Sequence, residues 1–300
     1  MRTVPEKRAG VVVLLGVTQI LSWASSFYLP AMLGTPMSRD LGVTAPTIFA
    51  AFSFALMISA LLGVHAGQAI DRWGGRPVLC ATNVIFAIGL ACLGSAQGIV
   101  GLFVAWAIMG IAMGSGLYEA AFATVVRYYG PAGRGAITGI TLIAGFASTL
   151  GWPATMLLET HFGWRGACHA WAAVQLVLCL PLNSLLPRTL PKAAAHAAAA
   201  ASQAGGPWRG RLRPFLMLAA MCTLTLFIGT AATAHLPRLL QASGLSLAAA
   251  TSVGALMGPS QVVARLLELG VLRRVHPMFS ARLATLLIPL AAVLLLARRA

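Results

Sequence analysis

The chain has 300 residues, of which 59% are hydrophobic and only 9% are charged, and its formal net charge is +15. A soluble domain carries roughly a quarter of its residues as charged side chains, so this composition excludes an ordinary soluble protein. Its apolar runs are long enough to cross the ~30 Å hydrocarbon core of a bilayer, which takes about 20 helical residues. The sequence therefore predicts an all-α, polytopic helical membrane protein.

About nine transmembrane helices are predicted from the apolar runs between polar breaks. The first run follows a basic N-terminus, but it is too long for the hydrophobic region of a secretion signal, and no clear small-x-small cleavage site follows it. We therefore expect it to be the first membrane span. The predicted spans cover residues 11–33, 46–70, 78–96, 99–127, 135–158, 166–187, 212–236, 244–272 and 280–297.

Six of these helices precede the one long polar break, and three follow it. The break reads RTLPKAAAHAAAAASQAGGPWRGRLR, which is rich in Ala, Gly and Pro and flanked by positive charge. This composition is typical of a linker. The sequence thus predicts a six-helix bundle at 1–187, a cytoplasmic linker at 188–213, and a partial bundle of three helices at 214–300.

The basic residues orient the predicted helices. With a cytoplasmic N-terminus, 16 of the 21 Lys and Arg residues fall in inside segments and 5 in outside segments, as the positive-inside rule requires. We expect a multi-pass protein of the cell membrane (inner or plasma membrane) whose partner is the lipid bilayer. Because the charge follows topology, with some attraction to anionic lipid, no nucleic-acid partner is expected.

All cysteines lie inside predicted spans. There are five of them, and none forms a CxxC pair. Small apolar side chains with inert thiols explain this distribution better than disulfide or metal chemistry does. We expect no metal and no cofactor.

The segment 67–77, GQAIDRWGGRP, places three charged residues and three glycines between the second and third predicted helices. Gly67 is expected to let the second helix approach a neighbour closely. Gly74 or Gly75 is expected to take the left-handed conformation that ends a helix. Arg76 is expected to hold the loop on the cytoplasmic side. A well-built loop explains all of this, but not the aspartate in the middle of the segment.

The same segment resembles the signature of the major facilitator superfamily between its helices 2 and 3, G-x-L-A-D-R-x-G-R-[RK]-x-x-L. Residues 67–79 read GQAIDRWGGRPVL, with Ala69 in place of leucine and Gly75 in place of the first of two basic residues. The resemblance extends to six helices, a linker and the start of a second set. It implies two halves that rock around a central site, and that helices 10 to 12 are missing. It also implies that Asp71, next to Arg72, meets the start of helix 11, where a helix N-terminus favours an anion.

One face of the eighth predicted helix is polar. Gln261, Arg265 and Glu268 follow i, i+4, i+7 spacing. Arg265 lies eight residues before the basic pair that follows this span, about 12 Å into the helix. A central arginine costs ~2.5–3.5 kcal/mol to insert, so Arg265 needs a partner. That partner is either a substrate anion or Glu268, and the sequence leaves both open.

This stretch resembles the Asp-x-x-x-Arg of helix 8 in monocarboxylate porters, a branch of the superfamily. The resemblance implies that Arg265 binds a substrate carboxylate. Gln261 stands in place of the aspartate, so the resemblance does not support proton coupling at that position. The stretch at 127–139 also looks like that branch.

Two further groups are candidates for the transport site. In the first helix, polar and aromatic side chains are expected to line a cavity, with Trp23 and Tyr28 as apolar walls that carry polar tips. In the fourth helix, Glu119 is a candidate for proton coupling, although a structural pairing with Arg72 or Arg127 is favoured over it. The first-helix group consists of Gln19, Ser22, Trp23, Ser25, Ser26 and Tyr28.

The sequence thus favours a secondary transporter that moves a small solute, an organic anion, by alternating access. A drug–proton antiporter is the weaker alternative, because the glycines of the fifth helix do not have that group's spacing. A truncated, non-transporting remnant of a transporter also stays open. An intramembrane enzyme is disfavoured: Ser115 with His169 would need a G-x-S-G pattern, and Met113 stands where its first glycine should be.

Overall fold

The structure is a computed structural model that describes residues 4–188 and 212–270 and residue 286. The chain forms two compact units, residues 1–206 and 207–300. Every element in the described residues is helical, as the composition predicts.

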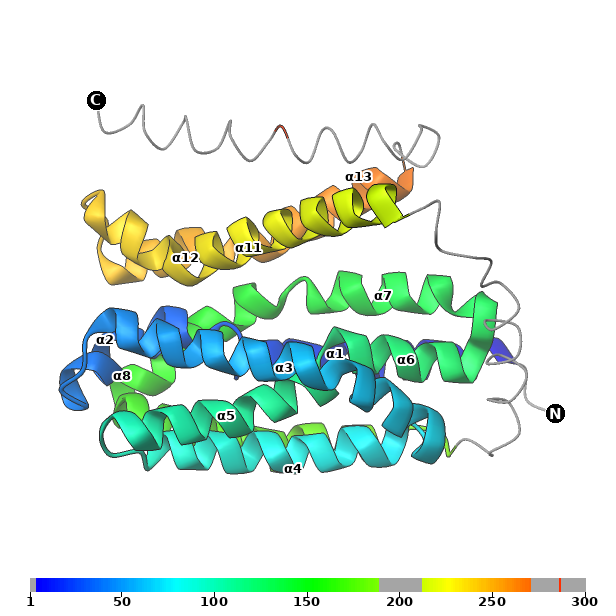
Figure 1. The fold of residues 1–300 in the computed structure, drawn as a ribbon, viewed down its shortest axis with the longest axis horizontal. Coiled ribbons are helices and arrows are strands. Elements are labelled where there is room, and N and C mark those ends of the chain that lie inside the picture. Colours follow the sequence, from blue (N-terminus) through cyan, green and yellow to red (C-terminus); the bar gives the residue numbers. More distant parts are fainter. Residues whose placement is uncertain (1–3, 189–211, 271–285, 287–300) are drawn as a thin grey trace. The chain divides into compact units, whose positions relative to one another are not determined.

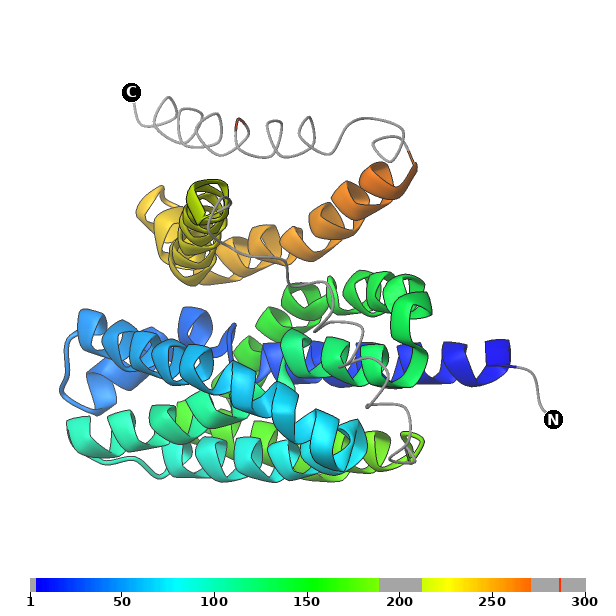
Figure 2. The ribbon, with the colours of Figure 1, turned by 45° about the vertical axis from the view of Figure 1, so that its right-hand side comes forward.

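The helices of the first unit lie side by side, with α3, α4, α5 and α6 adjacent in the views of Figures 1 and 2. A short 3₁₀ turn, η1 (Gly130–Gly133), and a π-helical turn, η2 (Gln175–Cys179), interrupt the α-helices. The α-helices are α1 (Val4–Ala24), α2 (Leu29–Asp40), α3 (Ala45–Trp73), α4 (Gly75–Gly94), α5 (Gly98–Gly116), α6 (Tyr118–Tyr129), α7 (Arg134–Ala144), α8 (Ala147–Val174) and α9 (Leu180–Ser184).

Several predicted spans are helices with a break inside them. The first span is α1 followed by α2, separated by residues 25–28, and the fourth is α5 followed by α6, separated at Leu117. The fifth is α7 followed by the first part of α8. Gly163, with a φ of 67°, then separates the fifth span from the sixth within α8. Glycine takes this positive φ at little cost because it has no Cβ.

Within the described residues, six helical stretches are long and apolar enough to cross a membrane. One of them, Gly98–Ser184, contains the predicted spans at 99–127 and 135–158 and all but the last three residues of the span at 166–187. The ninth predicted span, 280–297, lies outside the described residues except for residue 286. The structure therefore confirms a polytopic helical protein, whereas the total of nine spans stays a prediction.

Helices α3 and α5 pack closely because small residues face each other at their crossing. A methyl group added at Gly110 would lie 2.5 Å from the carbonyl oxygen of Ala55, and one at Gly114 would lie 2.7 Å from that of Ser59. The glycines and the residues opposite them are each four apart, so one face of each helix carries the contact. This small-xxx-small pattern lets two backbones approach in a membrane, where van der Waals packing drives association.

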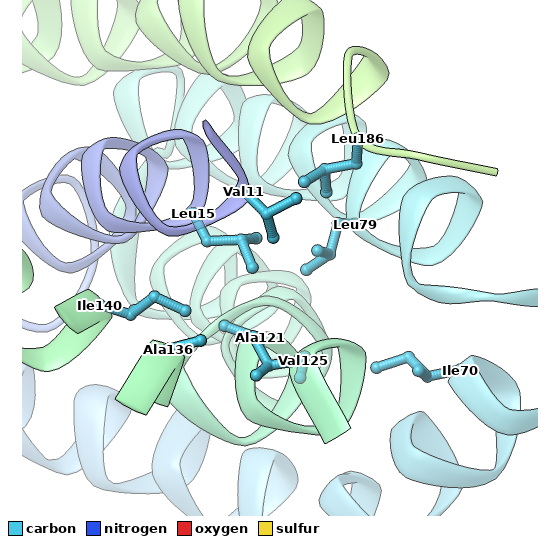
Figure 3. Packing of buried hydrophobic residues seen from close by; sticks show 10 residues of the cluster. Val11, Leu15, Ile70, Leu79, Ala121, Val125, Ala136, Ile140 and Leu186 are labelled. Carbon is cyan, nitrogen blue, oxygen red and sulfur yellow. The ribbon is translucent and has the colours of Figure 1, made fainter. Parts of the chain in front are cut away.

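A cluster of buried apolar side chains fills one end of the first unit, close to the loop between α3 and α4. Figure 3 shows side chains from α1, α3, α4, α6 and α7 around it. Leu186, which follows α9, also joins this cluster and brings the end of the unit's last helix against the first. The labelled members are Val11, Leu15, Ile70, Leu79, Ala121, Val125, Ala136, Ile140 and Leu186.

A salt bridge holds three segments together elsewhere in the first unit. Arg165 lies 2.9 Å from the Asp40 carboxylate at the end of α2. The same guanidinium donates to the carbonyl oxygens of Gly94 and Ala96, in the turn between α4 and α5. Trp164 also donates its indole N–H to Asp40, at 3.1 Å. The end of α2, this turn and the second part of α8 are thus fixed to one another.

The second unit consists of α11 (Leu212–Ala242), α12 (Leu247–Ala255) and α13 (Met257–Gly270). Ser246 caps α12 by accepting a hydrogen bond from the Ala249 N–H at 3.2 Å. The eighth span was predicted as one helix over 244–272, but the structure has two, α12 and α13, separated at Leu256. A break of a single residue leaves the apolar run uninterrupted, so hydrophobicity alone does not reveal it.

Candidate functional site

The break between α1 and α2 is the first element of the candidate site. Here the ladder of backbone hydrogen bonds is irregular, and the Tyr28 N–H reaches the Trp23 carbonyl at 3.1 Å. Two serine hydroxyls satisfy carbonyls on the helix just before the break. Ser25 donates to Leu21 at 2.8 Å, and Ser26 donates to Ser22 at 2.6 Å. Such side-chain bonds allow a helix to be broken within a membrane.

Aromatic rings surround this break. The Trp23 ring lies 5.0 Å from that of Phe27 and 4.9 Å from that of Tyr118, measured between centroids. Tyr28 continues the cluster to Trp152 on α8, at 6.2 Å. Helices α1, α6 and α8 therefore meet at the break through aromatic contacts. The prediction that Trp23 and Tyr28 form apolar walls is compatible with this arrangement.

Two polar atoms on α1 are buried beside these rings without a partner. Gln19 is 1% exposed, and its amide N–H donates to the Gly116 carbonyl at 2.8 Å. Within the described residues, its Oε1 atom and the Trp23 Nε1 atom have no hydrogen-bond partner. An acceptor and a donor thus lie one helical turn apart. A buried polar group without a partner is costly, so both atoms are suited to a polar ligand.

The break between α5 and α6 positions the residues around Glu119. Leu117 is extended, with φ −84° and ψ −159°, and α6 begins again at Tyr118. Glu119 is exposed on the first unit and lies in the first turn of α6, where a helix N-terminus favours a negative charge. Arg127 is eight residues further along the same helix, about 12 Å away along its axis.

A chain of buried hydrogen bonds connects α9, α4, η2 and the first break. Asn183 donates to Asn83 at 2.8 Å, Asn83 donates to Gln175 at 2.8 Å, and Gln175 donates to the Ser25 hydroxyl at 2.8 Å. Gln175 begins the π-helical turn η2, a feature often found at functional sites. This hydrogen-bonded chain was not predicted from the sequence. The signal for it was three amide side chains inside apolar runs, where each amide must find a partner.

The loop between α3 and α4 depends on two glycines. Gly74 has a φ of 94° and joins the two helices directly, which confirms a positive-φ glycine at the end of α3. Gly75 starts α4, and a Cβ there would collide with the side chain of Thr124 on α6. Within the first unit Gly67 does not make the expected close approach, because a Cβ there would meet nothing within 4 Å. Gly75, and not Gly67, makes the close approach.

The charged residues of this loop lie at one end of the first unit. Asp71 and Arg72 are exposed, and the Asp71 backbone carbonyl accepts a hydrogen bond from Arg127 on α6. The Arg72 guanidinium lies 5.7 Å from the ring centre of Trp73. Arg76 is half-buried in the first turn of α4. Because the bond from Arg127 is made to the backbone, it leaves the Asp71 side chain available for another role.

The second unit contains the predicted polar stripe. Gln261 and Arg265 both lie on α13, four residues apart on one helical face, and both are half-buried. The Glu268 side chain lies outside the described part of the chain. The structure therefore brings Trp23, Ser26 and Tyr28 together in the first unit, and Gln261 and Arg265 together in the second.

The chain is similar to known membrane transporters in sequence and in fold. The chain is 31% identical over 163 residues to monocarboxylate transporter 11 of Mus musculus, and 30% identical over 168 residues to that of Homo sapiens. These matches cover 49% and 51% of this chain, but only 35% of each relative. Among solved structures, a bacterial homolog of the human lysosomal transporter Spinster, in an inward-facing and occupied conformation, matches with a TM-score of 0.63.

That structural match has 16% sequence identity and covers 86% of this chain and 59% of the other, so it shows the fold alone. The model of the Major Facilitator Superfamily matches residues 15–298, which is most of the chain. This match agrees with the signature at 67–79, with the helical architecture and with the relatives. The chain therefore belongs to the Major Facilitator Superfamily, a family of multi-pass membrane transporters.

Proposed function

We propose that this protein is a secondary transporter that moves a small organic anion, with a carboxylate as the recognised group. The observation that carries the proposal is Arg265, a charged residue four positions from Gln261 on one face of α13. An ionisable group within a membrane span is expensive and marks a functional site by default. Similarity to proteins named monocarboxylate transporter 11 supports a carboxylate as the ligand.

Arg265 suits this role because of its shape as well as its charge. The guanidinium is planar and presents paired N–H groups that match the two oxygens of a carboxylate. Gln261 adds an amide that can donate to the same ligand or to a neighbouring hydroxyl. Both side chains are half-buried, so a bound anion would be partly removed from water, and its attraction to Arg265 would be stronger than in bulk solvent.

In the first unit, we propose that the residues around the α1–α2 break contribute to substrate binding. The free Gln19 Oε1 and Trp23 Nε1 atoms suit a hydroxyl or carbonyl group, and Trp23 and Tyr28 offer apolar walls. Ser26 is fully buried, and its hydroxyl bonds to its own helix. We therefore assign Ser26 to the shape of the site, with no direct bond from its hydroxyl to the ligand.

Two acidic residues complete the proposal. Glu119 is the candidate for proton coupling, because it is exposed on the first unit next to Tyr118, whose ring contacts Trp23. Asp71 is the candidate for conformational control, since its side chain is exposed while its backbone carbonyl binds Arg127. In both roles, replacement by the neutral amide is expected to impair transport and not ligand binding.

Ligand binding is testable on the purified protein. We expect small monocarboxylates to raise its melting temperature in detergent, because a ligand that binds only the folded state stabilises it. The matched control is the primary amide of each acid, which keeps the size and loses the charge. Stabilisation by an amide equal to that by its acid would contradict carboxylate recognition.

We also propose that the N-terminus and the linker are cytoplasmic, on the basis of the 16-to-5 division of basic residues. A single cysteine placed at Ala201 of a cysteine-free protein should then resist an impermeant thiol reagent added to intact cells, and should react after lysis. A cysteine placed at Ser95, in the turn after α4, is the control and should react from outside. The reverse pattern would contradict the orientation.

A further inference from the structure

A pocket with two arginines lies where the loop between α3 and α4 meets the end of α9. Its volume is about 450 Å³, within the range of small-molecule sites. It is distinct from the residues assigned to transport above. Its lining consists of Trp73, Arg76, Pro77, Cys80, Ser184 and Arg188.

The walls of this pocket are tied together. The Cys80 thiol contacts the Leu180 carbonyl at 3.9 Å, which joins α4 to α9. Tyr128 on α6 donates its hydroxyl to the Pro187 carbonyl at 2.9 Å, directly before Arg188. The backbone that carries Arg188 is therefore held by α6, and that of Arg76 lies in the first turn of α4. The two arginines are presented by a fixed frame.

Nothing in the described residues neutralises these two charges. The lining contains no carboxylate, and neither Arg76 nor Arg188 has a hydrogen-bond or ion-pair partner among the residues that the structure describes. The sequence of 189–211 contains no acidic residue either. The whole chain has only six acidic residues against 21 basic ones. Within the described residues the two arginines therefore lack an anionic partner, which an anion from outside the chain can supply.

The chemistry of the lining defines the anion. Ser184 already donates its hydroxyl to the Pro181 carbonyl at 2.7 Å, so the donors that the lining offers a ligand are the two guanidinium groups and the indole N–H of Trp73. Two guanidinium groups can surround a phosphate with paired N–H···O bonds. The remaining lining is apolar. Trp73 is 64% exposed, and tryptophan is common at the level of lipid headgroups.

We propose that this pocket binds the phosphate group of an anionic ligand through Arg76 and Arg188, with an anionic phospholipid headgroup as the source that the apolar lining favours. Arg72 lies against Trp73 at the rim and adds to the local positive potential. Free inorganic phosphate shares the recognised chemistry but would not use the apolar lining. The proposal is independent of the transported substrate.

The test is a titration of the purified full chain in neutral detergent, followed by native mass spectrometry. The arms are phosphatidylglycerol, zwitterionic phosphatidylcholine and inorganic phosphate. The variants are Arg76→Gln, Arg188→Gln and the double variant. The charge-matched control is Arg134→Gln, since Arg134 is exposed at the start of α7 and does not line the pocket.

Phosphatidylglycerol should bind more tightly than phosphatidylcholine. Each single glutamine variant should weaken it roughly fivefold, and the double variant roughly 25-fold, as one basic contact near an anionic lipid is worth about a factor of five. Arg134→Gln should change the affinity less than about twofold, well below that factor. Binding of inorganic phosphate with the same dependence on both arginines would support the phosphate site and identify a soluble ligand as its source. An equal loss of phosphatidylglycerol affinity in Arg76→Gln, Arg188→Gln and the control Arg134→Gln would overturn the proposal.

Lysine variants keep the test decisive if a glutamine variant fails to fold. Arg76→Lys and Arg188→Lys retain the charge and lose the paired donors. We expect each lysine variant to bind phosphatidylglycerol more weakly than the wild type. Where the glutamine variant at the same position folds, the lysine variant should bind more tightly than that glutamine variant. Wild-type affinity in both lysine variants would contradict recognition by the guanidinium groups.

Discussion

Arg265→Gln is expected to remove the thermal stabilisation by small carboxylates and to weaken their binding roughly tenfold to a hundredfold. The physical reason is the loss of charge-assisted hydrogen bonds, each worth about 1.5–3 kcal/mol. Without ligand, the variant should melt close to the wild type. If the partner of the half-buried Arg265 is the ligand, the unliganded protein loses no ion pair when Arg265 is replaced. The measurement is the melting temperature of both proteins with and without a monocarboxylate.

A structural role for Arg265 gives a different result. If its partner is Glu268 on the same helix, the substitution leaves that carboxylate unpaired and lowers the melting temperature equally with and without ligand. Arg265→Lys separates the two cases further, because it keeps the charge and loses the paired donors. Partial recovery of carboxylate binding in the lysine variant is expected if Arg265 binds the substrate. Arg134→Gln, far from α13 in sequence, controls for net charge.

Gly110→Ala is expected to destabilise the first unit by about 1–3 kcal/mol, the usual cost of overpacking a tight contact. A Cβ at this position would lie 2.5 Å from the Ala55 carbonyl oxygen and 2.9 Å from its Cα. Both are backbone atoms, so the crossing helices α3 and α5 must separate. The loss should be visible as a lower melting temperature or as unfolding at a lower denaturant concentration.

The control for this prediction is Gly63→Ala. Gly63 lies on α3 as well, but an added Cβ there would meet nothing within 4 Å. In a helix, alanine is favoured over glycine by up to about 1 kcal/mol, so this variant should be as stable as the wild type or more stable. Equal stability of the Gly110→Ala and Gly63→Ala proteins would show that the close approach of α3 and α5 is not required.

The spans were predictable because hydrophobic length dominates the energetics of a membrane helix. The breaks inside the spans were not. At 25–28 serine hydroxyls bond to carbonyls of the same helix, and at Leu117 the backbone becomes extended inside a predicted span. Hydropathy averages over such positions, since what permits them is a local bond or a neighbouring helix.

In the α3–α4 loop, too, one feature was predictable from the sequence and another was not. Its sequence was enough to predict a positive-φ glycine, because φ is a property of one residue, and Gly74 has it. Within the described first unit the close packing is at Gly75 and not at Gly67, since such packing depends on which helix lies opposite. The chain of amides at Asn83, Gln175 and Asn183 was missed for the same reason: the three residues are up to 100 positions apart in sequence.

The measurement that tests the central claim most directly is uptake of a radiolabelled monocarboxylate by proteoliposomes that contain the protein. We predict saturable uptake that unlabelled carboxylates compete away, that the corresponding amides do not affect, and that Arg265→Gln abolishes. Uptake by Arg265→Gln equal to that of the wild type, or wild-type uptake no greater than that of empty liposomes, would contradict transport of an organic anion through Arg265.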